Sequence, residues 1–137
     1  SIIHEESKQV SEQSRIAGVY INRLNDGWPL QADPTIKFAA YQLPDFKNSI
    51  IKRVLNKHKL IVSPYNTYMY KGLPPGLIAM PDLSAVEAVL NHEIHSYYFF
   101  AADAQKPGFH KFSKTLSGHN INAKAYHSYL NRKGIKK

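Results

Sequence analysis

The sequence predicts a single α+β domain in which helices pack around a small mixed or antiparallel sheet. Its length of 137 residues is enough for one domain with its own core. Hydrophobic residues make up 43% of the chain and charged residues 20%, which is typical of a globular protein. Several segments show the helical spacing of apolar residues, and two aromatic segments near the C-terminal end are typical of strands.

The first part of the chain is predicted to be helical. Residues 1–7 form a short helix, and Ser11 can cap a second helix over residues 11–26. After an irregular connection, Asp33 and the proline that follows it begin a third helix over residues 33–41, because this pair is typical of a helix start.

The middle of the chain is predicted to alternate between helices and stiff loops. Residues 48–57 have the apolar spacing of a helix, and residues 63–68 form a loop that leads into a short strand. Residues 72–76 contain two prolines between glycines and are the stiffest segment. Ser84 begins a capping box and therefore a helix over residues 84–92.

The C-terminal part predicts a hairpin followed by a helix. Residues 97–102 are apolar and aromatic, a turn follows around Gly108, and residues 109–112 alternate and can pair back. The last helix covers residues 116–132, and Gly134 provides its stop.

Composition limits the functional classes. The chain carries 18 Lys and Arg against 10 Asp and Glu, a net charge of +8 that suits nucleic acid, an anionic membrane surface or an anionic polymer. Cysteine is absent, which excludes disulfides, zinc–thiolate sites and thiol nucleophiles. No run of apolar residues is long enough to span a membrane. Because the chain begins without Met inside a predicted helix, we expect a fragment of a longer protein.

Glu6 is the first candidate for a catalytic group. On a helix it shares a face with Ile2, Ile3 and Val10, which lie three or four residues away. A carboxyl group on an apolar face is partly desolvated, and this favours the protonated form that a general acid needs. The alternative is an ordinary boundary residue whose carboxylate reaches water.

Other candidate residues have both structural and functional interpretations. Arg23 can interact with a helix dipole or bind a carboxylate or sugar hydroxyls, and Asp33 can be a helix cap or a catalytic group. The aromatic and amide side chains of residues 63–68 suit stacking on a sugar, but they also suit a packed turn. His92 and His95 are three residues apart, whereas a zinc motif of this kind requires four.

Three motifs together are highly specific. They are Gln31-Ala32-Asp33-Pro34-Thr35, Ser63-Pro64-Tyr65-Asn66-Thr67 and Gly72-Leu73-Pro74-Pro75-Gly76. With shorter matches in the same order, they resemble the catalytic region of the endolytic murein transglycosylase family (MltG/YceG-like) over nearly the whole chain. The sequence departs from the family's Glu-x-Glu-Thr motif, because His4 replaces the first acidic residue and Ser7 the threonine. Family members often have Met at the position of Trp28. Residues 80–82 stand where the family has Asn-Pro-Gly.

The resemblance implies cleavage of peptidoglycan glycan strands at the MurNAc–GlcNAc linkage, leaving 1,6-anhydro-MurNAc ends. It assigns the acid/base role to Glu6, with neither metal nor cofactor. It also implies substrate-binding residues, which are Asn22, Arg23, Gln31, Asp33, Thr35, Tyr65, Asn66, Thr67, Pro74 and Pro75. Residues 1–137 then form the catalytic domain of a longer protein, with a missing N-terminal part providing a membrane anchor.

The implied location is the cell envelope, on the extracytoplasmic side of the bacterial inner membrane. The implied partners are glycan strands and cell-wall synthesis proteins, without nucleic acid. A lytic mechanism suits a lone acid, because the C6 hydroxyl of the substrate replaces the second carboxylate of ordinary glycosidases. Two alternatives stay open: a hydrolase with Asp33 as second carboxylate, and a non-catalytic module that binds glycan or nucleic acid.

Overall fold

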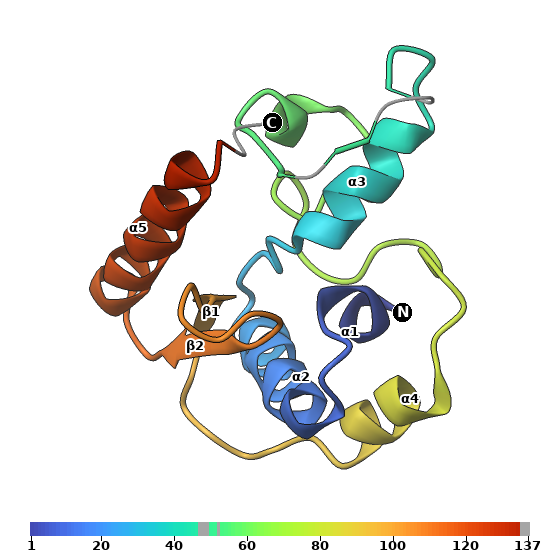
Figure 1. Cartoon of the computed structure of the whole chain (residues 1–137). Helices are drawn as coiled ribbons and strands as arrows, with labels where there is room; N and C mark the ends of the chain where they lie inside the picture. Colours follow the sequence, from blue (N-terminus) through green and yellow to red (C-terminus); the bar gives the residue numbers. More distant parts are fainter. Residues whose placement is uncertain (47–49, 52, 135–137) are drawn as a thin grey trace.

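Helix α2 lies between α1, α4 and the β-hairpin (Figure 1). The computed structural model describes residues 1–46, 50–51 and 53–134. Within them, the elements are α1 (Ile2–Glu6), α2 (Val10–Asn25), α3 (Asp33–Tyr41), the 3-10 helix η1 (His58–Leu60), α4 (Leu83–Leu90), β1 (Phe99–Ala102), β2 (His110–Ser113) and α5 (Leu116–Arg132). The two strands are antiparallel, so the predicted α+β class with helices around a small sheet is confirmed.

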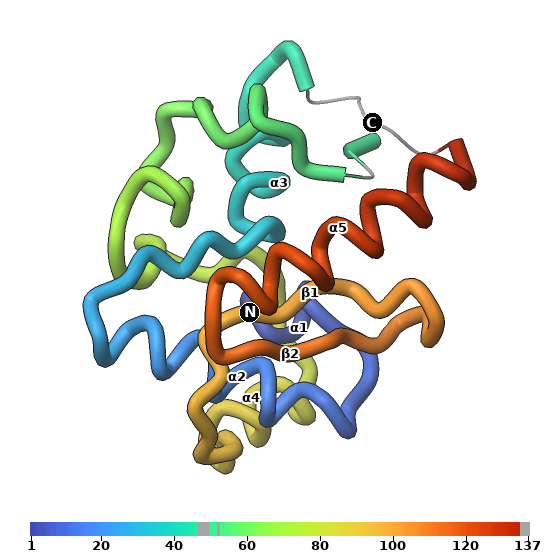
Figure 2. Tube along the Cα trace, turned by 90° about the vertical axis from the view of Figure 1, so that its left-hand side faces the viewer, coloured from blue at the N-terminus to red at the C-terminus, as the bar shows by residue number. Residues whose placement is uncertain are grey.

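The hairpin and the last helix form as the sequence predicts. Strands β1 and β2 pair with Phe100 opposite Phe112, and Gly108 in the connecting turn has a φ of +84° that favours glycine. Helix α5 packs on both strands and has the predicted bounds, with the Thr115 hydroxyl accepting a hydrogen bond from Gly118 N–H at its start (Figure 2). Strand β1 begins at Phe99, two residues later than predicted.

The N-terminal helices differ from the prediction at their junction. Helix α1 ends at Glu6, and Ser7 is extended with a φ of −151°. Helix α2 then begins at Val10 with Gln9 as its N-cap, so the expected cap at Ser11 is wrong. Because the break at Ser7 reorients the chain, Val10 does not continue the face of Glu6, and it is 65% exposed.

Three predictions for the middle of the chain are wrong. Residues 50–51 and 53–57 are not helical, and residues 47–49 and 52 of the expected helix lie outside the described residues. Residues 63–68 lead into turns rather than a strand. Helix α4 begins at Leu83 with Asp82 as N-cap, so Ser84 lies inside the first turn and the predicted capping box is wrong. No side chain makes a capping hydrogen bond at this helix start.

The core gathers around α2 and extends toward α1 and α4. Its buried members are Ile3, Ile16, Ala17, Tyr20, Leu30, Ala32 and Ala85. Burial of these apolar side chains is the main force that holds α1 in place. The end of α1, where Glu6 lies, is thus fixed by the core.

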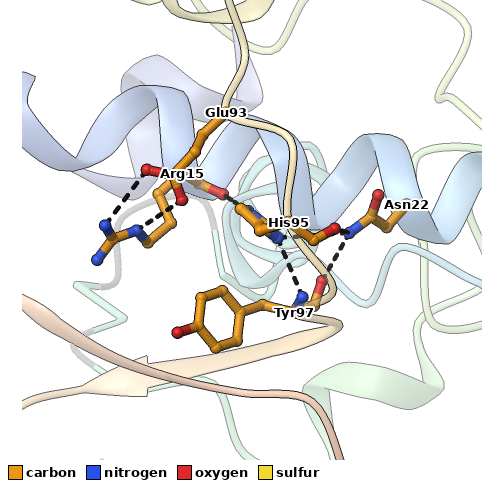
Figure 3. Close-up of polar contacts among 5 residues, drawn as sticks. All are labelled: Arg15, Asn22, Glu93, His95 and Tyr97. Atoms are coloured by element: carbon orange, nitrogen blue, oxygen red, sulfur yellow. Dashed lines mark hydrogen bonds and ion pairs between the residues drawn. The ribbon is translucent and has the colours of Figure 1, made fainter.

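The segment after α4 crosses α2 at Gly18. A Cβ atom at Gly18 would lie 2.4 Å from the Glu93 carbonyl oxygen and 2.6 Å from His95 Nε2. Arg15 binds the Glu93 carboxylate, and Asn22 donates to the carbonyl oxygens of His95 and Tyr97 at 2.9 and 3.0 Å (Figure 3). We call these five side-chain positions, Arg15, Asn22, Glu93, His95 and Tyr97, the α2 clip. The clip directs the chain from α4 into β1.

Candidate active site

Glu6 stands at the C-terminal end of α1, facing α2 and α3. Ile3, one turn earlier, is 5% exposed in the core and anchors the helix. The chain after Glu6 is held by Ser7, whose carbonyl oxygen accepts a hydrogen bond from Gln13 Nε2 at 2.9 Å. Glu6 is itself half-buried. A carboxyl group is thereby held in a fixed, partly desolvated position.

The surroundings of Glu6 favour its protonated form. Burial and the negative charge of Asp33 raise the pKa of Glu6 to about 8, burial being the larger cause. A hydrogen bond from the Tyr20 hydroxyl and the positive charge of Lys37 act in the opposite direction but do not offset the first two. At neutral pH Glu6 therefore holds its proton and can act as a general acid.

Asp33 is held by a second tyrosine. The Tyr68 hydroxyl donates a hydrogen bond to Asp33 Oδ1 at 2.5 Å. Burial raises the pKa of Tyr68, and the neighbouring Asp33 carboxylate raises it further, so Tyr68 remains a neutral donor. The pKa of Tyr20 is also raised, mainly by burial and then by Glu6. We call Glu6, Tyr20, Asp33 and Tyr68 the acid cluster.

Asn66 fixes the loop that presents Tyr68. Its side chain is fully buried, and its Nδ2 donates to the carbonyl oxygens of Lys59 and Ile61 at 3.0 and 2.7 Å. Its Oδ1 accepts from the backbone N–H groups of Tyr68 and Met69 at 2.9 and 3.1 Å. The amide thus acts inside the loop, and a glycan could reach it only if the loop opened.

Thr67 joins this loop to the start of α3. Its Oγ1 lies 2.8 Å from Thr35 Oγ1 and accepts a hydrogen bond from Ala32 N–H at 2.9 Å. Its carbonyl oxygen accepts from Gln31 N–H at 3.1 Å. Thr35 and Thr67 are 0% and 2% exposed, so in this structure both side chains bond within the protein framework.

Gln31 differs from the buried threonines beside it. Its side chain is exposed, and its φ of +51° places a non-glycine residue in the left-handed region. Such a conformation costs energy and is held here by the contacts with Thr67. The exposed Gln31 side chain thus lies two residues before Asp33, and its contact with a substrate stays a prediction.

Arg23 and Asn22 are used inside the protein. Arg23 is 6% exposed, and its guanidinium donates to the carbonyl oxygens of Tyr98 and Pro29 at 2.7 and 2.8 Å. It also lies 4.9 Å from the ring centre of Phe99. The amide of Asn22 belongs to the α2 clip. The fork expected at Arg23 is present, but it binds backbone carbonyl groups instead of a ligand.

Tyr65 and the two prolines lie on the outer part of the same region. Tyr65 is half-buried, with its ring 4.7 Å from that of Phe38, and its hydroxyl would be 3.3 Å from a Cβ atom at Gly76. Pro74 is half-buried and Pro75 exposed. Pro75 borders a hollow of about 360 Å³ that Val62, Pro64 and Leu73 also line. These groups remain candidate contacts for a ligand.

Two residues of the acid cluster were not predicted. Tyr20 lies within the predicted helix over residues 11–26 and Tyr68 within the loop of residues 63–68, and the sequence links neither of them to Glu6. Helical spacing places Tyr20 on the buried face of α2, but nothing in the sequence shows that α1 brings a carboxyl group to its hydroxyl. Within the described residues, no three His, Asp or Glu side chains gather to hold a metal ion, and no helix is long and apolar enough to cross a membrane.

The fold and the site together define a class: a small α+β domain with a carboxylic acid kept protonated by burial and by a neighbouring carboxylate. The chain belongs to the YceG-like family, whose family model matches residues 1–125. This match confirms the resemblance carried by the sequence motifs.

Known relatives agree with this assignment. A Bacillus subtilis (strain 168) protein named endolytic murein transglycosylase is 40% identical over 136 residues, which are 99% of this chain and 34% of the relative. A protein of the same name from Streptococcus pneumoniae serotype 2 is 34% identical over 103 residues, 75% of this chain and 18% of its own. The chain therefore spans about a third or less of these relatives.

The fold has a counterpart among solved structures. A crystal structure of a YceG-like protein from Listeria monocytogenes superposes with a TM-score of 0.77 at 38% identity. The superposition covers 88% of this chain and 37% of the Listeria chain.

Proposed function

We propose that this chain is the catalytic region of an endolytic peptidoglycan lytic transglycosylase, with Glu6 as its single acid/base. The observation that carries the proposal is the half-buried position of the Glu6 carboxyl group at the end of α1, where burial and the charge of Asp33 raise its pKa to about 8. The names of the Bacillus and Streptococcus relatives support the same reaction and the same substrate.

In the proposed reaction, Glu6 first donates its proton to the O4 atom that leaves as the C1–O4 bond breaks. The C6 hydroxyl of the same MurNAc then attacks C1, and Glu6 accepts its proton as the C1–O6 bond forms. No water is consumed, and the enzyme returns to its starting state. The attack gains from proximity, because the nucleophile and the reacting carbon belong to one sugar.

The place and partners of the reaction follow from this proposal. Glycan strands lie in the cell envelope, so we place the reaction on the extracytoplasmic side of the bacterial inner membrane, beside cell-wall synthesis proteins. The net charge of +8 suits a polymer that bears carboxylate groups. Gln31, Tyr65, Pro74 and Pro75 are the proposed direct contacts with the glycan, because each has accessible atoms near the acid cluster or its loop.

The test is the Glu6→Gln variant incubated with purified peptidoglycan, with the sugar ends identified by mass spectrometry. We expect formation of 1,6-anhydro ends to fall by about 100-fold or more, because glutamine cannot donate the proton. Glu5→Gln is the matched control, since Glu5 is the exposed neighbour on the same helix. Anhydro ends produced equally by both variants would refute the role of Glu6.

The second candidate function is a hydrolase in which Asp33 is the other carboxylate. The observation in its favour is that the charge of Asp33 acts on Glu6, as expected for a pair of neighbouring carboxyl groups. The two functions differ in their products, because a hydrolase takes its nucleophile from water. Reaction in ¹⁸O-labelled water therefore separates them: labelled reducing ends indicate hydrolysis, and unlabelled anhydro ends indicate the lytic reaction.

A further inference from the structure

The Asp33–Tyr68 contact has no role in the lytic reaction as described so far. Asp33 lies at the start of α3 with its side chain open to solvent, and a lytic mechanism needs no second carboxylate. Yet the Tyr68 hydroxyl binds its Oδ1 at 2.5 Å, and the buried Asn66 side chain accepts a hydrogen bond from the Tyr68 backbone N–H at 2.9 Å. These contacts fix the orientation of the Asp33 carboxylate.

We propose that Asp33 and Tyr68 form a positioning pair: the Tyr68 hydroxyl holds the Asp33 carboxylate in one orientation at the start of α3, which packs against the helix that carries Glu6. In this orientation the negative charge of Asp33 acts on the Glu6 carboxyl group until the glycan binds. The proposal rests on the proposed function of Glu6 and adds a role for two further residues. It also gives the motif in residues 63–68 a role, because this loop sets the position of the Asp33 carboxylate through Tyr68.

The contacts of the loop support this role over direct substrate binding. Asn66 fixes the backbone N–H of Tyr68, and Thr67 bonds to Ala32 and Thr35 on either side of Asp33. Both ends of the Tyr68–Asp33 hydrogen bond therefore belong to one rigid unit. In contrast, Asp33 with Oδ1 bound to a phenol is less available as a nucleophile, because that oxygen already shares a proton.

The charged and titratable groups that act on Glu6 lie on the two helices packed against α1. Helix α3 contributes Asp33 and Lys37, and α2 contributes Tyr20. Tyr68 of the loop is itself affected by Glu6, whose charge raises the pKa of Tyr68. Among these, Asp33 is the group whose charge favours the protonated acid, and its effect on the pKa of Glu6 is second to burial. Removal of Asp33 should thus lower the pKa without returning it to an ordinary value.

The first experiment measures the titration of Glu6 directly, by NMR of the side-chain carboxyl carbon in the 1–137 chain. We expect the midpoint to fall by about one pH unit in Asp33→Asn and by less in Tyr68→Phe, where the carboxylate keeps its charge but loses its anchor. Asp33→Glu should restore most of the shift. The matched controls are Asp45→Asn and Tyr126→Phe, which lie outside the acid cluster and should leave the midpoint unchanged.

A double variant shows whether Tyr68 acts through Asp33. If it does, Asp33→Asn combined with Tyr68→Phe gives the same midpoint as Asp33→Asn alone. Additive shifts would show that Tyr68 acts on Glu6 independently, and unchanged midpoints in both single variants would overturn the proposal. Backbone amide spectra of each variant confirm that it is folded.

The second experiment follows the pH dependence of glycan cleavage. We expect the basic limb of the kcat profile of Asp33→Asn to move to lower pH by the same amount, so that the ratio of its kcat to that of the wild type falls several-fold between pH 6 and pH 8. Loss of cleavage at every pH with an unmoved Glu6 titration would instead make Asp33 a catalytic residue. If the wild-type chain produces no anhydro ends, the proposed function fails, whereas the titration still decides the positioning role.

Discussion

The acid cluster and the α2 clip each contain a glutamate, and the two glutamates have opposite kinds of neighbours. In the clip, Glu93 accepts two hydrogen bonds from Arg15, at 2.9 and 3.2 Å, and its side chain is 37% exposed. In the acid cluster, Glu6 has the neutral hydroxyl of Tyr20 as a hydrogen-bond donor and the carboxylate of Asp33 as a neighbour. The first carboxylate is bound by a group of opposite charge, whereas burial and a neighbouring carboxylate raise the pKa of the second.

The comparison shows that partners and burial, rather than residue type, separate a structural glutamate from an acid. Glu12 agrees with this rule. The side chains of Glu12 and His110 are both 12% exposed. The Glu12 carboxylate accepts hydrogen bonds from the ring of His110 at 2.9 Å and from its backbone N–H at 3.0 Å. Glu6 is thus distinguished by its neighbours as well as by its burial.

The largest effect is expected where the acid cluster depends on a buried amide. Asn66→Ala removes both donors to Lys59 and Ile61 and the acceptor for Tyr68 and Met69, so it leaves buried polar groups without partners. We expect a loss of roughly 3–5 kcal/mol of unfolding free energy by urea denaturation. The exposed Asn91 makes one bond, to Glu87 O at 3.2 Å, so Asn91→Ala should cost less than about 1 kcal/mol. Equal losses would contradict this contrast.

The next effect distinguishes the two regions by pH. Because the folded pKa of Glu6, about 8, lies above its ordinary value of 4.5, the folded state binds the proton more tightly. The wild type should therefore lose stability as the pH rises from about 4.5 to about 8. Glu6→Gln removes this dependence and should be more stable than the wild type at pH 8 by roughly 3 kcal/mol, and similar at pH 4. Glu93→Gln is the control and should leave the dependence of the unfolding free energy on pH unchanged. If the unfolding free energies of Glu6→Gln and the wild type changed in parallel with pH, the prediction would be wrong.

Backbone packing in the α2 clip is the third test. Gly18→Ala places a methyl group against the Glu93 carbonyl, which is backbone, and against the His95 ring, which is held by its contact with Arg15 O at 2.8 Å. We expect a net loss of roughly 2 kcal/mol in thermal unfolding, although alanine favours a helix. Gly118→Ala on α5 is the control, because its nearest contacts, with Ser113 and Thr115 at 3.2 and 3.3 Å, are longer than those at Gly18 and require much smaller shifts. A neutral Gly18→Ala would show that the crossing is loosely packed.

The smallest effect is expected at the ion pair of the clip. Arg15 and Glu93 are 46% and 37% exposed, so solvent and salt screen their attraction. Arg15→Gln should change the unfolding free energy by less than about 1 kcal/mol, and the difference should shrink in high salt. A larger loss that persists at high salt would indicate that Arg15 acts through its packing over the Phe112 ring, 5.5 Å away, instead of through charge.

Local sequence signals were sufficient for the C-terminal part of the fold. Alternating aromatic residues around the turn at Gly108 predict the hairpin, and apolar spacing with a glycine stop predicts α5 with its observed bounds. The same kind of signal failed for residues 50–57. There apolar spacing is present, but long-range contacts, such as the hydrogen bond from Ile51 N–H to the Tyr41 hydroxyl at 3.0 Å, hold the described residues in a non-helical path.

The sequence by itself determined the fold class and the family motifs, and it made Glu6 the candidate acid, because short-range spacing records which face of an element is apolar. It did not determine which contacts the side chains of the motif residues make. Only the tertiary structure brings Tyr20 to Glu6 and Tyr68 to Asp33, and only it turns Asn66 and Thr67 into framework residues. The physical reason is that the proton affinity of a carboxyl group depends on the burial and charges around it, and these come from segments far apart in the chain.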